Sequence, residues 1–172
     1  MNAASAILAM VSQVAWFDAV SHAERRAASQ RAVQEYVQSC GSQWPVRWAA
    51  DWQDAGNVVR GLNDTTGFWS LEQRWREQAL AAVQAANRGE ALAEALHHLS
   101  ILGYETVRPV VADEELGRVA SGAALWTLAE ALTWATVDDV LAPLPNPFLP
   151  KLKLFELGHW PLGLSQGSIV VA

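Results

Sequence analysis

The chain has 172 residues, of which 51% are hydrophobic and only 17% are charged, whereas an average soluble domain carries about 25% charged residues. This composition excludes intrinsic disorder and predicts one domain with a substantial core. The formal net charge of −6 argues against direct binding to nucleic acid, because nucleic-acid-binding domains usually present a basic surface.

The single cysteine, Cys40, rules out an intramolecular disulfide and a cysteine-rich zinc site. Residues 3–17 form the most apolar stretch near the start, but polar residues interrupt it and it is too short to span a bilayer. No basic residue precedes that stretch, as one would in a secretory signal. We therefore expect a cytoplasmic protein without membrane contact.

The abundant alanine, leucine, glutamine, glutamate and arginine favour helix over most of the chain. We predict a mainly α fold, a single-domain helical bundle with a small C-terminal β-hairpin. The expected order is one or two helices over 1–39, a short helix and loop over 44–69, helices over 71–88 and 90–101, an edge strand over 104–111, and a long helix from 113. The single domain would comprise a helical part over 1–142, a proline-rich strut over 143–150, and a short helix with the hairpin over 151–172.

Local signals support several of these elements. Ser70 and Gln73 have the spacing of a capping box, and Glu72 and Arg76 have the spacing of an i,i+4 ion pair. Gly89 is expected to close the helix over 71–88, and His97 and His98 to lie in the last turn of the next helix.

Two Glu-x-x-His spacings, Glu94 with His97 and Glu156 with His159, are the sharpest candidates for catalysis or metal binding. Gly158 interrupts the second motif, and a di-iron site would also need a further glutamate from each of two other helices. No nucleophile motif or phosphate-binding loop occurs either. We therefore expect no metal, no cofactor and no catalytic residues, with His159 in a turn near Trp160.

Five of the nine tryptophans lie between residues 44 and 75. Trp44, Trp48 and Trp52 recur at i, i+4 and i+8, so they would form one aromatic ridge if this stretch were helical. The ridge could be packed core, because tryptophan is large and apolar, or a protein-binding surface, because tryptophan is enriched in interface hot spots. The residues proposed to bind a partner are Trp48, Asp51, Trp52, Asp54, Asp64 and Trp69.

The same spacing recurs at Trp126, Glu130 and Trp134. There, the leucines of the same helix already define a buried stripe. At least one of these two tryptophans is therefore expected to lie toward the rim of that stripe.

The sequence Asn146-Pro147-Phe148, followed by Leu157-Gly158-His159-Trp160-Pro161, resembles the last third of small Ala- and Trp-rich bacterial immunity proteins, which are encoded beside secreted toxins. This resemblance implies a cytoplasmic, non-enzymatic protein that binds one toxin domain and blocks its active site. Immunity proteins are too diverse for residue roles to be carried over.

These observations lead to a first hypothesis and an alternative from another class. The first is a stoichiometric inhibitor, monomeric or homodimeric in isolation, whose acidic surface attracts a basic cognate toxin. The alternative is a small helical enzyme or ligand-binding protein with a Trp-lined pocket, in which Glu94, His97 or His159 act as acid-base groups. A two-fold scaffold that buries the aromatic ridge would be a third possibility.

Overall fold

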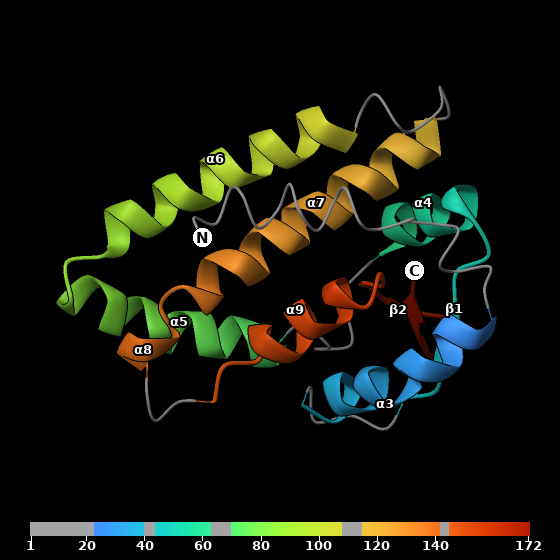
Figure 1. Cartoon of the computed structure of the whole chain (residues 1–172), viewed down its shortest axis with the longest axis horizontal. Coiled ribbons are helices and arrows are strands. Elements are labelled where there is room, and N and C mark those ends of the chain that lie inside the picture. The colour runs from blue at the N-terminus through green and yellow to red at the C-terminus, as the bar shows by residue number, and fades with distance from the viewer. Residues whose placement is uncertain (1–22, 40–43, 63–69, 108–114, 142–144) are drawn as a thin grey trace.

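The computed structural model describes residues 23–39, 44–62, 70–107, 115–141 and 145–172. It is mainly helical with a small sheet, as predicted (Figure 1). The helices are α3 (Ala23–Ser39), α4 (Trp52–Gly61), α5 (Ser70–Ala85), α6 (Gly89–Val107), α7 (Glu115–Ala135), α8 (Asp138–Leu141) and α9 (Phe148–Glu156); the strands are β1 (Val46–Trp48), β2 (Pro161–Ser165) and β3 (Ser168–Val171). None of the described helices is both long and apolar enough to cross a membrane.

Helix α7 is the central element of the molecule. It packs against α6, α4 and α9, and Figure 1 shows it between α6 and α4. Its alanines Ala120, Ala124 and Ala131 are fully buried. Such small side chains let the neighbouring helices approach closely. This explains how α7 can pack against three helices.

The hairpin of β2 and β3 is present as predicted, with an antiparallel register. Its turn holds Gln166 and Gly167, both at positive φ. The structure adds β1, which pairs in parallel with β3 and places Val46 opposite Ile169. The strand order β1-β3-β2 makes β3 the central strand.

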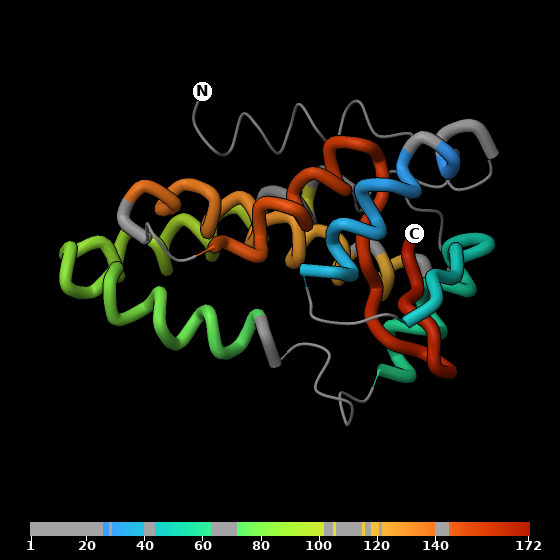
Figure 2. The backbone as a smooth tube through the Cα atoms, turned by 90° about the horizontal axis from the view of Figure 1, so that it is seen from below, coloured from blue at the N-terminus to red at the C-terminus, as the bar shows by residue number. Residues whose placement is uncertain are grey.

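The small sheet is covered on both faces. Because side chains alternate along a strand, Ile169 and Val171 pack in one cluster with α3 and α9, whereas Val170 packs in another with α4 and α7. Figure 2 shows α3 alongside α9, where the two helices are in contact. The sheet is therefore enclosed between two helical layers.

Helix α6 differs from the prediction. It continues to Val107, so the strand expected over 104–111 is wrong for residues 104–107, and residues 108–111 lie outside the described part. His97 and His98 lie in the middle of the helix, not in its last turn. A glycine inside a helix costs only about 1 kcal/mol relative to alanine, so Gly103 is too weak a signal to end α6.

The turn between α5 and α6 also differs. Helix α5 ends at Ala85, and Gly89 begins α6 instead of closing α5. Asn87 adopts the left-handed conformation there, with φ of 56°. Asparagine is one of the few non-glycine residues that tolerate this region, so it makes the turn that the sequence analysis assigned to glycine.

The proline-rich segment is shorter than predicted, because α9 already begins at Phe148. The side chain of Asn146 fixes this start. Its Oδ1 accepts a hydrogen bond from the Phe148 amide at 3.0 Å, and its Nδ2 donates to the Trp134 carbonyl at 3.2 Å. One buried asparagine thus joins the start of α9 to the end of α7.

Candidate functional site

The aromatic ridge expected from Trp44 to Trp52 does not form as one helix. Trp48 ends the edge strand β1, whereas Trp52 begins α4. The backbone is extended here because β1 pairs with β3: the Ile169 amide donates to the Pro45 carbonyl at 2.9 Å, and the Ala49 amide donates to the Val171 carbonyl at 2.8 Å. The i, i+4, i+8 spacing therefore does not place the three tryptophans on one face of a helix in this segment.

The rings of Trp48 and Trp52 are both half-buried at the rim of the core. Trp48 lies against His159, with ring centroids 4.8 Å apart, and the guanidinium of Arg26 lies 5.7 Å from the centre of the Trp48 ring. Trp52 packs beside Trp160 at 6.1 Å. Each of these two tryptophans, predicted to bind a partner, thus packs with part of its ring against the core. The rest of the ring remains accessible to solvent.

The two aspartates beside these rings have different surroundings. Asp51 is exposed and caps α4, with its Oδ1 accepting a hydrogen bond from the Asp54 amide at 2.8 Å. Asp54 accepts from the Arg47 guanidinium at 2.7 Å and from the Ala50 amide at 3.0 Å. Burial alone would raise the pKa of Asp54, but these two hydrogen bonds and the Arg47 charge outweigh it, so the pKa lies below its ordinary value. Asp64 and Trp69, the remaining members of the predicted set, lie outside the described residues.

The expectation for the second tryptophan pair is confirmed. Trp134 is 7% exposed and packs edge-on against Trp75, with centroids 5.1 Å apart. Trp126, eight residues earlier on α7, is 52% exposed. One turn before Trp126, a side chain added at Gly122 would meet open space. The accessible face of α7 therefore carries a large aromatic ring beside a glycine.

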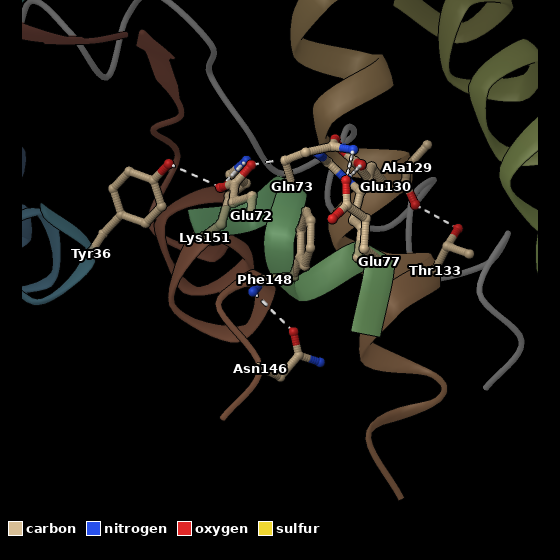
Figure 3. Close-up of polar contacts among 11 residues, drawn as sticks. Tyr36, Glu72, Gln73, Glu77, Ala129, Glu130, Thr133, Asn146, Phe148 and Lys151 are labelled. Atoms are coloured by element: carbon tan, nitrogen blue, oxygen red, sulfur yellow. Dashed lines mark hydrogen bonds and ion pairs between the residues drawn. The ribbon is translucent and has the colours of Figure 1, made fainter. Parts of the chain in front are cut away.

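A buried ionic network, which the sequence analysis missed, lies where α3, α5, α7 and α9 meet (Figure 3). Glu72 and Lys151 are each only 1% exposed, and the Lys151 Nζ lies 2.6 Å from the Glu72 Oε1. The Tyr36 hydroxyl donates to the same oxygen at 3.3 Å. Arg76 approaches the other oxygen of Glu72 at 3.6 Å, which confirms the predicted i,i+4 pair.

The network continues through Arg76 to α7. The Arg76 Nε donates to the Glu130 Oε1 at 2.6 Å. The guanidinium of Arg76 and the ammonium of Lys151 each lie 5.2 Å from the centre of the Phe148 ring, a distance suited to a cation–π contact. The opposite charges and the aromatic ring thus offset the cost of burying these groups. We call this network the clamp, because it connects α3, α5, α7 and α9.

A sequence signal for this clamp exists in α9. The buried positions of that helix are Phe148, Lys151, Leu154 and Phe155, so Lys151 shares a helical face with three large apolar residues. A lysine on such a face needs a buried carboxylate partner. The sequence alone does not say that Glu72 is that partner.

The two Glu-x-x-His motifs lie in different surroundings. Glu94 and His97 are exposed on α6. Glu156 accepts a hydrogen bond from the Lys153 ammonium at 2.8 Å. His159 is buried, and its Nδ1 lies 3.3 Å from the Ala172 oxygen. Within the described ranges, no group of three or more histidine, cysteine, aspartate or glutamate side chains is arranged to hold a metal ion.

No protein-family model matches the chain, and no characterised protein or solved structure is significantly similar to it. Its function has to be inferred from the residues themselves.

Proposed function

We propose that this protein is a stoichiometric inhibitor, an immunity protein, which acts in the cytoplasm and blocks the active site of a cognate bacterial toxin domain. The acidic, aromatic surface of this protein would bind a basic surface of the toxin. The net charge of −6 supports this, because opposite charge accelerates the association of two proteins and selects among partners.

The exposed Trp126 is the observation that carries this proposal. A tryptophan ring left 52% exposed keeps a large apolar area in water, and such areas mark interaction sites. Tryptophan is also among the residues that dominate binding energy at interfaces. The neighbouring Gly122 leaves room for a partner side chain beside the ring.

The residues predicted from the sequence form a second accessible group. Asp51 is exposed, and Trp48 and Trp52 keep part of their rings accessible. Helix α4, which begins at Trp52, packs directly against α7, the helix of Trp126. We propose that Trp48, Asp51, Trp52 and Asp54 belong to the contact surface, together with Asp64 and Trp69.

The alternative, a small enzyme or ligand-binding protein, has less support. Its proposed acid-base groups Glu94 and His97 lie on an exposed helix face. His159 is turned toward the Ala172 oxygen and the Trp48 ring. A general acid or base needs a partner and a protected site, and neither Glu-x-x-His pair supplies both.

The test is to express the protein together with the toxin-like protein encoded beside its gene. We expect a 1:1 complex and loss of toxicity. Trp126→Ser should weaken binding by about 30-fold, as for a hot spot of about 2 kcal/mol, without lowering the melting temperature. Leu80→Ser, which changes another exposed apolar residue on a different helix, is the matched control and should change binding less than about threefold.

Failure of the wild-type protein to bind or to protect against any neighbouring toxin would overturn the proposed function. Equal effects of the two substitutions would leave the inhibitor function standing but would remove Trp126 from its binding surface.

A further inference from the structure

The outer side of α6 carries a continuous stripe of exposed side chains. They recur at helical spacing along the whole helix and lie on the side opposite the buried Leu92 and Leu99. The stripe comprises Glu90, Glu94, His97, His98, Ile101 and Glu105. It is about 22 Å long at 1.5 Å per residue. In Figure 1, α6 runs along one edge of the molecule, beside α7.

The glutamates of this stripe differ from most of the other carboxylates in the described part of the chain. Glu90, Glu94 and Glu105 form no ion pair with any other described residue, and α6 contains no lysine or arginine. Elsewhere in the described chain, carboxylates are commonly neutralised by a basic side chain. Those that form such pairs are Glu35, Asp54, Glu72, Glu115, Glu130, Asp139 and Glu156.

One large apolar side chain lies in the stripe, between His98 and Glu105. Ile101 is 44% exposed and is one of few large hydrophobic side chains of the described residues left open to water. The exposed Ala91 and Ala93 keep the surface low near the first glutamates, so that a partner can approach the helix closely. Protein interfaces usually combine such an apolar contact with polar and charged residues around it.

We propose that this outer face of α6 docks a positively charged protein surface. Lysine or arginine side chains of the partner would pair with Glu90, Glu94 and Glu105, and an apolar side chain would cover Ile101. This inference rests on the proposed function and identifies a contact surface of the same inhibitor, because α7, which carries Trp126, lies against α6.

The charge of the stripe selects this partner over others. A nucleic acid or an anionic membrane would be repelled, and a second copy of this chain packed across a two-fold axis would oppose glutamate to glutamate. A basic protein surface is the partner that gains from all three glutamates, since each unpaired carboxylate can form an ion pair without breaking one that already exists.

The test compares two triple variants of the full chain. Glu90→Gln/Glu94→Gln/Glu105→Gln removes the charge of the stripe. Glu35→Gln/Glu77→Gln/Glu156→Gln removes the same charge from exposed positions on α3, α5 and α9. Association with the adjacent toxin is measured at low and at physiological ionic strength. We expect the α6 variant to associate about 10-fold more slowly and to lose most of its salt dependence, and the control to change less than about threefold.

Equal behaviour of the two variants, with wild-type binding intact, would overturn the α6 surface while the inhibitor function stands. If the wild-type protein binds no toxin, the proposed function fails, and a second measurement decides on the surface. A short amphipathic lysine–leucine helical peptide is then the probe. Slower hydrogen exchange confined to residues 89–107 on adding it supports the docking face, and protection elsewhere or nowhere overturns it.

Discussion

The Glu72–Lys151 pair is the residue-scale feature on which the interior depends. Burying two charges is costly, and their mutual attraction offsets that cost only when hydrogen bonds satisfy the remaining polar atoms. Here the Tyr36 hydroxyl and the Arg76 guanidinium both approach Glu72. The cost of burying the two charges is therefore offset while both residues are present. Removing either residue would lower the free energy of unfolding, because the charge that remains would no longer be offset by its partner in the pair.

Glu72→Gln should lower the free energy of unfolding by about 3–5 kcal/mol, because the buried charge of Lys151 would lose the carboxylate that lies 2.6 Å from its ammonium. The matched control lies on the same helix as Lys151. Glu156→Gln removes the partner of Lys153, but that pair is exposed to solvent, so it should cost at most about 1 kcal/mol. Urea denaturation of the two variants checks this.

A cost for Glu72→Gln no larger than that of Glu156→Gln would contradict the clamp. Should Glu72→Gln fail to fold, Glu72→Leu combined with Lys151→Met replaces both charges by apolar groups of similar size. That double variant should be more stable than either single one, because both charges of the pair are removed together.

The sequence could predict only part of this network. Glu72 and Arg76 are neighbours on one helix, so their pairing follows from spacing. Lys151 and Lys153 lie two residues apart and carry the same charge, yet the first is buried and the second exposed. The difference depends on the packing of α9 against α3 and α7, which local spacing does not encode.

At the scale of elements, local signals predicted the β2–β3 hairpin, but they missed the third strand and the extension of α6 to Val107. The β2–β3 hairpin follows from two apolar runs separated by a Gln-Gly turn. β1 is only three residues long, and its strand conformation comes from β3, far away in the sequence. The tryptophan spacing around β1 therefore suggested a helix that the sheet overrides.

The hairpin turn supplies an element-scale prediction. Gln166 and Gly167 have φ of 51° and 75°, as in the type I′ turn of a two-residue hairpin, which favours Asn-Gly. Gln166→Asn should therefore raise the free energy of unfolding by about 0.5 kcal/mol, because asparagine tolerates positive φ better than glutamine. Gly167→Ala should lower it by about 1 kcal/mol, although the space beside Gly167 is open. Thermal melts of the two variants that shift in the same direction would refute this turn geometry.

At the scale of the whole molecule, α9 contributes side chains to all three clusters of the core. Phe148 packs with α5, α6 and α7, Leu154 packs with α3 and β3, and Phe155 packs with α4, α7 and β2. The half-buried Leu152 touches two of these clusters. The sequence predicted that this short helix exists but not that it joins three clusters, because most of the residues it packs against lie far from it in the sequence.

This linkage predicts that the protein unfolds as one cooperative unit. Far-UV circular dichroism, which reports the helices, and tryptophan fluorescence, which reports the rings spread over the core clusters, should give superimposable denaturation curves. Leu154→Ala should shift both curves together by about 2–5 kcal/mol, since Leu154 is fully buried. Leu149→Ala, an exposed position on the same helix, should shift them by less than about 1 kcal/mol. Separate transitions for the two probes, in the wild type or in Leu154→Ala, would mean that the clusters unfold independently and that α9 does not couple them.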